Sequence, residues 1–233
     1  MEITSRDNET FKNLLRLTEK KWRRRFGLCI VEGEKAVKDN LDRIERVFLR
    51  PSRADFNNAI ILHDKLFDMI SSLETDQGVL AVVKIPPPGA VTFPFLVLDG
   101  IQDSGNMGTL LRTAAAFGFG TVFCVDCVDV WSQKVLRASS GVSFALNVIE
   151  KFVKPDECLL VGADLKGEGA SAIASLRPQR LGLVLGSEGR GIRAELLESI
   201  DKFVTVPMNP GVESLNVAVA GGILMYELKK AVL

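Results

Sequence analysis

The chain has 233 residues, 47% of them hydrophobic, which is enough to bury the cores of two unequal domains. Its 29 Lys and Arg residues balance its 29 Asp and Glu residues, which excludes nucleic-acid binding through an overall basic charge and leaves only a local basic patch. No apolar run reaches the roughly 18 residues of a membrane-spanning helix and the N-terminus lacks a signal-peptide core, so we expect a cytoplasmic protein without membrane contact.

The N-terminal part of the chain is predicted to be a small α/β unit. An amphipathic helix is expected around residues 9–21. Short apolar runs predict strands at 28–32, 46–49, 59–62 and 79–83.

Residues 12–25, KNLLRLTEKKWRRR, form a basic stretch with one aromatic side chain inside it. Trp22 could stack on a base while the neighbouring cations contact phosphates. A solvated basic helix face explains the same pattern equally well. The stretch has one acid, Glu19, against these cations: Lys12, Arg16, Lys20, Lys21, Arg23, Arg24 and Arg25.

Four prolines and a glycine between residues 84 and 94 predict a linker over 85–93, which separates a domain of residues 1–84 from one of residues 94–233. The second domain carries continuous apolar runs, which predict strands buried on both faces and hence a mainly parallel sheet covered by helices. Ligands of such sheets usually lie at the carboxyl ends of the strands. The predicted strands are 95–99, 121–126, 158–164, 181–186 and 203–207.

Three polar or glycine-rich segments follow these strands, and the first is Asp99–Arg112. Asp103, Ser104 and Asn106 are candidates to cap the helix that begins there. A helix start with free N–H groups and a nearby arginine, Arg112, would suit a phosphate. An ordinary strand-to-helix turn with a solvated Arg112 is the alternative.

The second segment, Leu185–Gly191, places glycines and the carboxylate of Glu188 at a strand end. Glycines allow a ligand to approach the backbone closely. The segment matches only part of a dinucleotide-binding fingerprint, which disfavours a nicotinamide-dependent dehydrogenase. A simple turn remains the alternative.

The third segment, Val206–Gly222, is a proline-stiffened loop that leads into a helix running to Leu233. Ser214 is expected to cap this helix, and Asn216 to present its amide from the first turn. Gly221 and Gly222 each cost about 1 kcal/mol relative to alanine inside a helix, so we expect close packing against both. Plain core packing explains the apolar residues of the segment equally simply.

The four cysteines, at positions 29, 124, 127 and 158, do not form a metal-ligand pattern, and His63 is the only histidine. We therefore expect no metal site, and buried free thiols instead.

Taken together and in this order, the three segments resemble the three motifs of the SpoU (TrmH) class of SPOUT RNA 2′-O-methyltransferases. The matching pieces are DSGNMGTLLRTAAAFG, LVLGSEGRGI and VPMNPGVESLNVAVAGGI, and SQKVLRASSGVSF resembles the segment between motifs. ITSRDNETFKNLLRL, IVEGEKAV and TDQGVLAVV resemble the family's L30e-like RNA-binding domain. The resemblance implies a SPOUT-type α/β fold with a mainly parallel sheet and a C-terminal trefoil knot, a preceding small α/β L30e-like domain, and a homodimer.

The resemblance also implies S-adenosylmethionine as the cofactor and a ribose 2′-hydroxyl of a structural RNA as the methyl acceptor. Because a guanidinium is a poor base, Arg112 is expected to act first as a phosphate anchor. Transfer from a sulfonium needs alignment of the nucleophile with the methyl group more than acid catalysis, since the thioether leaves without a proton. No metal is required for this transfer. The catalytic residues are expected to be Arg112, Asn106, Glu188, Ser214 and Asn216. The cofactor contacts are expected to be Gly186, Val206, Met208 and Leu215.

Ribosomal RNA is the favoured substrate because of the L30e-like pattern, and transfer RNA is the alternative. A non-catalytic RNA-binding or assembly factor with the same fold is a further alternative, which the intact motif residues disfavour. The sequence departs from the family pattern at Ser104 and Asn147, where many members have proline, and at Val206, where isoleucine is commoner.

Overall fold

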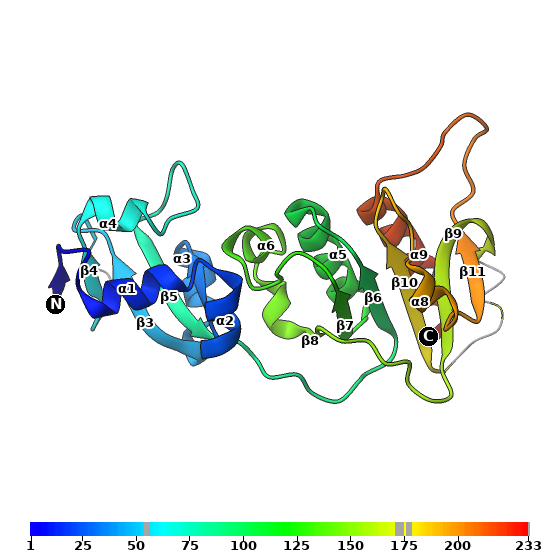
Figure 1. The fold of residues 1–233 in the computed structure, drawn as a ribbon, viewed down its shortest axis with the longest axis horizontal. Helices are drawn as coiled ribbons and strands as arrows, with labels where there is room; N and C mark the ends of the chain where they lie inside the picture. The colour runs from blue at the N-terminus through cyan, green and yellow to red at the C-terminus, as the bar shows by residue number, and fades with distance from the viewer. Residues whose placement is uncertain (54–55, 171–174, 176–178, 233) are drawn as a thin grey trace. The chain divides into compact units, whose positions relative to one another are not determined.

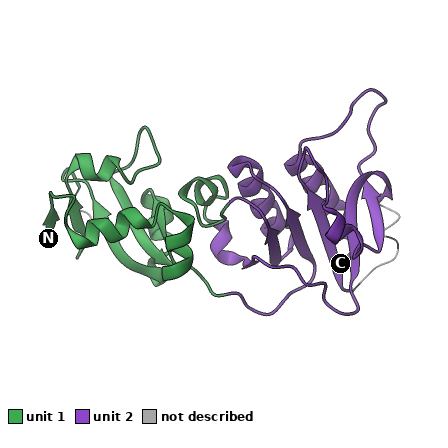
Figure 2. Cartoon of the chain, viewed as in Figure 1, with its two compact units in different colours: residues 1–87, 129–141 green, residues 88–128, 142–233 purple. Residues whose placement is uncertain are grey.

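The chain folds into two compact units (Figure 2). The computed structural model describes residues 1–53, 56–170, 175 and 179–232. The first unit comprises Met1–Pro87 and Asp129–Gly141, and the second comprises Pro88–Val128 and Val142–Leu233. The sequence predicts a single boundary at the proline-rich linker, whereas the segment 129–141 returns to the first unit in the structure.

The first unit contains a mixed five-stranded sheet in the order β1-β4-β3-β5-β2, of which Figure 1 labels β3, β4 and β5. β3 is antiparallel to β5 and parallel to β4. Four of these strands match the predicted runs, and β1 is an additional two-residue edge. The strands are β1 (Glu2–Ile3), β2 (Leu28–Glu32), β3 (Ile44–Leu49), β4 (Ile60–Leu62) and β5 (Val79–Lys84). The helices are α1 (Glu9–Arg16), α2 (Lys20–Phe26), α3 (Glu34–Lys38), α4 (Asp64–Asp68), α6 (Gln133–Ala138) and the short 3-10 helix η1 (Leu41–Arg43).

The single helix predicted over 9–21 is two helices in the structure. The Thr18 hydroxyl donates to the Leu15 carbonyl at 2.8 Å, and Glu19 is extended, so the chain restarts as α2 at Lys20. α2 ends at Gly27, whose φ of +64° is a conformation that glycine adopts without steric cost.

A buried ion pair holds the segment 129–141 on the first unit. Arg23 of α2 donates from Nε to Asp129 Oδ2 at 2.7 Å, and both side chains are 8% exposed. A second guanidinium nitrogen of Arg23 donates to the Leu17 carbonyl at 2.7 Å. Arg23 is therefore engaged inside the protein, and the interpretation that groups it with the exposed cations of the basic stretch is wrong.

The second unit is built on a six-stranded sheet in the order β11-β9-β10-β6-β7-β8, and all its pairings are parallel. The mainly parallel α/β fold is thus confirmed, and all five predicted strands are present. The strands are β6 (Phe95–Asp99), β7 (Thr121–Val125), β8 (Asn147–Ile149), β9 (Leu159–Gly169), β10 (Leu181–Gly186) and β11 (Lys202–Thr205). The helices are α5 (Ser104–Phe117), α8 (Ala194–Leu197), α9 (Val217–Val232) and the 3-10 helix η2 (Val142–Ala145). The trefoil knot stays a prediction.

The order of the strands fixes where a ligand can bind. From β6 the chain winds outward through β7 to β8, while β9, β10 and β11 lie on the other side of β6. The winding direction therefore reverses between β6 and β10, and the space outside the carboxyl ends of these two strands is the usual ligand crevice of an open parallel sheet.

β8 is the strand of the second unit that is not predicted from the sequence, and at its start Asn147 makes bonds that a proline could not. The backbone N–H of Asn147 donates to the Gly120 carbonyl at 2.9 Å, a bond that proline cannot make. Its side-chain oxygen accepts from the Gly89 N–H at 2.8 Å, and its amide nitrogen donates to the Ala90 carbonyl at 2.9 Å. Asn147 thus ties β8 to the segment that precedes β6.

Gly221 and Gly222 both lie in α9, but only one of them needs to be glycine. A Cβ on Gly221 would come within 2.6 Å of methyl groups of Leu110 and Leu185, which are buried. A Cβ on Gly222 would meet the Thr113 methyl group at 3.8 Å, an ordinary contact. The expectation of close packing holds for Gly221 and is wrong for Gly222.

We expect Gly222→Ala to raise the free energy of unfolding by about 0.5–1 kcal/mol, because alanine is the better helix former. Gly221→Ala gains the same helix propensity but overpacks the contact between α9, α5 and β10, which typically costs about 1–3 kcal/mol. Urea unfolding of both variants measures the difference. Equal shifts of the two unfolding midpoints would contradict this account of α9.

Candidate active site

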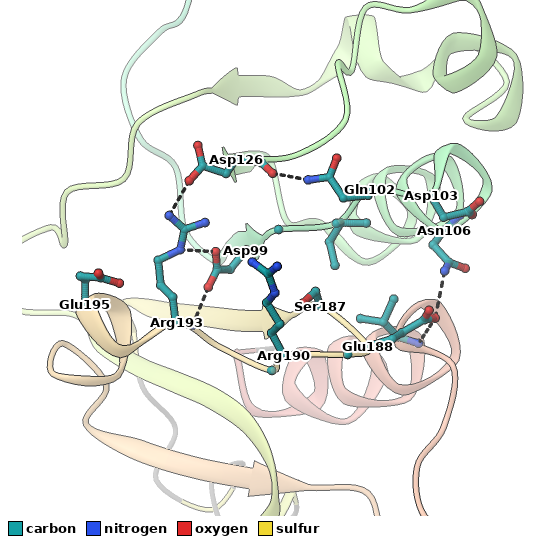
Figure 3. A pocket seen from close by; sticks show the side chains of 15 residues that line it. Asp99, Gln102, Asp103, Asn106, Asp126, Ser187, Glu188, Arg190, Arg193 and Glu195 are labelled. Carbon is teal, nitrogen blue, oxygen red and sulfur yellow. Dashed lines mark hydrogen bonds and ion pairs between the residues drawn. The ribbon is translucent and has the colours of Figure 1, made fainter.

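Two cavities lie at the carboxyl ends of the central strands, within the second unit. The polar cavity, of about 850 Å³, opens outside β6 and β10 (Figure 3). Its charged and amide lining residues are Asp99, Gln102, Asp103, Asn106, Asp126, Glu188, Arg190, Arg193 and Glu195. The apolar cavity, of about 300 Å³, lies beside β10, β11 and the start of α9.

Arg193 organises one side of the polar cavity. Its Nε donates to Asp99 Oδ1 at 2.6 Å, its backbone N–H donates to Asp99 Oδ2 at 2.8 Å, and its guanidinium reaches Asp126 Oδ2 at 2.6 Å (Figure 3). Asp99 is only 2% exposed, so this buried carboxylate is compensated by charge and by hydrogen bonds. The pairing joins the ends of β6 and β7 to the loop after β10.

Arg190 is the other cation of the polar cavity and stands apart from this network. It lies in the turn between Ser187 and Gly191, which exchange two backbone hydrogen bonds of 2.8 and 3.1 Å. Figure 3 shows its side chain extended toward the cavity. Within the described part of the chain Arg190 makes no hydrogen bond or ion pair, so its charge is available to an anionic ligand.

Asn106, Glu188 and Asn216 meet in a hydrogen-bonded trio, one residue from each of the three predicted segments. Glu188 Oε1 accepts from Asn106 Nδ2 at 3.0 Å, an interaction visible in Figure 3, and from Asn216 Nδ2 at 2.9 Å. Asn216 Nδ2 also donates to Asn106 Oδ1 at 3.0 Å. The backbone N–H of Val217 adds a longer bond of 3.4 Å to the same Glu188 oxygen. The structure therefore brings these three predicted residues together.

Both asparagines of the trio lie at helix starts. Asp103 caps α5 by accepting from the Asn106 N–H at 2.7 Å. The Asn216 side-chain oxygen accepts from the Ala218 and Val219 N–H groups at 2.9 and 3.3 Å, so it caps α9 while its amide nitrogen faces Glu188. The prediction that Ser214 is this cap is wrong, since the helix begins at Val217, three residues after Ser214.

The apolar cavity brings together the residues predicted to contact a cofactor. Its lining includes Gly186 and several aliphatic residues, together with the acidic residues Asp164 and Glu188. The lining contains all four predicted cofactor contacts, Gly186, Val206, Met208 and Leu215, and two of the predicted catalytic residues, Glu188 and Ser214.

The two cavities share part of their walls. Ser187, Glu188, Gly191 and Val217 line both of them. Glu188 thus stands between an apolar space and a polar one, with one carboxylate oxygen held by the trio. Its other oxygen, Oε2, makes no hydrogen bond within the described part of the chain.

Arg112 does not join this arrangement. It lies on α5 six residues after Asn106, about 9 Å further along the helix axis. It is exposed and lines neither cavity.

Sequence reasoning missed Asp99, Arg190 and Arg193 as site residues. A charge at the end of a fully apolar strand was the available signal for Asp99. The sequence does not identify Arg190 and Arg193 as site residues, because solvated arginines are common in turns.

All four cysteines are buried and unpaired with one another. Burial raises the pKa of the Cys127 thiol to about 11, and its Sγ donates to the Leu98 carbonyl at 3.2 Å. Burial also raises the pKa of Cys29 and of Cys158. Across residues 1–53, 56–170, 175 and 179–232, no group of three or more His, Cys, Asp or Glu side chains is close enough to hold a metal.

Over the same described ranges, no helix has the length and apolarity needed to cross a membrane.

Comparison with known proteins gives matches to both units. The model of the SpoU rRNA Methylase family matches residues 94–226, and that of the MRM3-like substrate binding domain matches residues 8–81. A 23S rRNA (guanosine(2553)-2′-O)-methyltransferase, RlmP of Bacillus subtilis, is 31% identical over 98% of this chain and 99% of its own length. An uncharacterized tRNA/rRNA methyltransferase of Synechocystis is 35% identical over 98% of this chain and 93% of its own. The crystal structure of an AdoMet-bound rRNA methyltransferase from Sinorhizobium meliloti superposes with a TM-score of 0.84, 25% identity, and coverage of 100% of this chain and 98% of that one.

Proposed function

The chain belongs to the SpoU rRNA methylase family, and we propose that it transfers a methyl group from S-adenosylmethionine to a ribose 2′-hydroxyl of ribosomal RNA. The relatives named as rRNA 2′-O-methyltransferases support this reaction, and the AdoMet-bound neighbour supports the cofactor. The observation that carries the proposal for the site is the position of Glu188 in the wall shared by the two cavities.

The apolar cavity suits S-adenosylmethionine in its chemistry. Its aliphatic lining can cover a flat apolar ring, and the backbone of Gly186, free of a side chain, allows close approach. The carboxylates of its two acidic lining residues, Asp164 and Glu188, can accept hydrogen bonds from hydroxyl and ammonium groups and favour a positive charge. When bound, S-adenosylmethionine supplies an electrophilic methyl group on a positively charged sulfur.

The residues of the polar cavity then have separate tasks. Glu188 Oε2 accepts the hydrogen bond of the ribose 2′-hydroxyl and takes its proton as the oxygen attacks. Asn106 and Asn216 hold the carboxylate in one orientation through Oε1, so the free oxygen faces the acceptor. Arg190 binds a phosphate of the acceptor nucleotide. Positioning of this kind suits methyl transfer, which requires alignment of the nucleophile and needs no acid for the leaving thioether.

Incubation of the purified protein with labelled S-adenosylmethionine and separate ribosomal and transfer RNA pools tests the proposal. We expect label in ribosomal RNA, recovered as a dinucleotide that resists alkaline hydrolysis because its 2′-oxygen is methylated. Label in transfer RNA alone would contradict the substrate, and label in neither pool would contradict the enzymatic function.

Arg112 remains a proposed phosphate anchor, because the resemblance implies it while the single chain leaves it exposed. We expect Arg112→Ala to keep its dissociation constant for S-adenosylmethionine, since Arg112 lines neither cavity, and to lose methyl transfer about 100-fold through misplacement of the RNA. Isothermal titration and single-turnover assays measure the two quantities. Normal turnover of this variant would remove Arg112 from the site.

We also propose that the protein is a homodimer. Val219, Ile223 and Tyr226 of α9 are 51%, 40% and 49% exposed, and their spacing places them on one face of the helix. α9 packs against α5, which carries the exposed Arg112, and we expect the interface to include this arginine.

Ile223→Lys is expected to convert the dimer to a monomer, because it places a charge in the centre of the apolar stripe. Light scattering coupled to size exclusion measures the mass. Lys151→Glu, a charge reversal at an exposed position after β8, is the control and should leave the mass unchanged. A wild-type monomer would refute the homodimer itself.

A further inference from the structure

A third cavity, of about 390 Å³, lies in the first unit and shares no lining residue with the two cavities described above. Buried side chains form its floor, and Phe26, which is 41% exposed, forms part of its wall. Its size falls within the usual range of small-ligand pockets, about 300–1,000 Å³. It is lined by Thr10, Asn13, Leu14, Leu17, Phe26, Leu28, Glu45, Arg46, Phe48 and Val82.

An irregularity in β3 gives this cavity its polar rim. The register of β3 against β5 shifts between Ile44 and Arg46, which is a β-bulge. In a regular strand, neighbouring side chains point to opposite faces, but Glu45 and Arg46 both line the cavity. Glu45 pairs with Lys84 at 2.8 Å, whereas Arg46 has no ion pair within the described part of the chain. The bulge thus presents an exposed cation at the mouth of an apolar pocket.

Residues of the basic stretch adjoin the same cavity through Phe26 and Asn13. Trp22 stacks on Phe26 with 5.5 Å between ring centroids, so the two rings form a continuous aromatic surface beside the cavity. The guanidinium groups of Arg16 and Arg25 lie 5.2 and 5.4 Å from the Trp22 ring centroid. Arg16 also donates to the side-chain oxygen of Asn13, itself a lining residue, at 2.8 Å. The aromatic pair and the cations therefore adjoin one pocket.

The apolar floor, the aromatic wall and the arginines together indicate which class of ligand this cavity binds. An apolar floor with an exposed aromatic wall suits a flat ring, and the exposed arginines of α1, α2 and β3 suit an anionic chain that carries the ring. Two ion pairs in this region, Lys12 with Glu9 and Lys21 with Glu19, are exposed and therefore weak. Their lysines can exchange these partners for the phosphates of a polyanion.

We propose that this cavity binds an unpaired nucleobase of the RNA substrate, stacked on Phe26, with the adjoining phosphates held by Arg16, Arg25 and Arg46. Trp22 is a positioning residue that supports Phe26 and keeps the arginines in place. The inference rests on the proposed function, since it assumes that the substrate is RNA. It gives the first unit a role in choosing RNA with a single-stranded base, separate from the chemistry of the second unit.

The test measures binding of the full-length protein to a fluorescein-labelled RNA hairpin with an unpaired loop, by anisotropy over a range of salt concentrations. Phe26→Leu keeps an apolar wall but removes stacking, and we expect it to weaken binding about tenfold. Arg16→Gln and Arg25→Gln should each reduce the slope of log affinity against log salt by about one. Lys65→Gln, which removes an exposed cation of α4, is the control and should retain the affinity of the wild type.

Binding of S-adenosylmethionine and the melting temperature should stay unchanged in all these variants, which excludes misfolding as the cause. Trp22→Leu is a second variant that leaves the cavity lining intact, and it too should weaken RNA binding. Wild-type affinity in both Phe26→Leu and Trp22→Leu would overturn the proposal, as would equal affinity of the wild type for a fully paired duplex. If the wild type binds the hairpin through these residues but methylates no RNA, the proposed function fails and the binding site stands.

Discussion

Glu188→Gln is expected to lower the rate of methyl transfer at saturating substrates about 100-fold, while the protein stays folded. The carboxylate has two tasks that glutamine cannot combine. Oε1 accepts from two asparagine amides, so a glutamine must keep its oxygen on that side to avoid opposing their N–H groups. Its own amide nitrogen then faces the acceptor, where it donates a hydrogen bond and cannot take a proton.

Single-turnover rates with ribosomal RNA, measured with the melting temperature, test this expectation. Glu195→Gln is the matched control, because Glu195 lines the same polar cavity and forms no hydrogen bond or ion pair in the described part of the chain. It should retain a rate within about twofold of the wild type, since an exposed substitution without partners has little to disturb. If both variants lose the same activity, the loss reflects the charge of the cavity and the specific role of Glu188 is refuted.

The parts of the fold that the sequence predicted are those in which local pattern and burial agree. β6 and β10 are continuous apolar runs because both faces of the sheet are covered, and a parallel sheet gathers the loops at its carboxyl ends. Glu188, Asn106 and Asn216 could be placed together for that reason, once the motif resemblance had given the order of the segments.

What the sequence did not show depends on contacts between residues far apart in the chain. Arg193 is separated from Asp99 by 94 residues, and Arg23 from Asp129 by 106. Neither pair leaves a local pattern, so Arg23 looked like one more surface cation. A glycine within a helix indicates close packing in many cases but not in all. The structure distinguishes the two glycines, because side chains pack closely against Gly221 and not against Gly222.

Gly186→Ala is expected to abolish S-adenosylmethionine binding, with at least a 100-fold rise in the dissociation constant, and to lower the free energy of unfolding by about 1–3 kcal/mol. A Cβ on Gly186 would lie 2.2 Å from the carbonyl carbon of Gly191 and 2.4 Å from the backbone nitrogen of Ile192. Those neighbours are backbone atoms, so no side-chain rotation can relieve the overlap.

The overlap can be removed only if the turn from Ser187 to Gly191 moves. Residues of this turn line both cavities. Separating Gly186 from Gly191 breaks the paired backbone hydrogen bonds between Ser187 and Gly191 and displaces Glu188 from the asparagines. Gly189→Ala is the control in the same turn, because its Cβ would meet nothing within 4 Å and its φ is not positive. Calorimetric titration with S-adenosylmethionine and urea unfolding should find Gly189→Ala unchanged and Gly186→Ala impaired in both. Normal cofactor binding by Gly186→Ala would show that the turn can move to accommodate the added Cβ. That result would refute the inference that the turn forms a rigid wall between the two cavities.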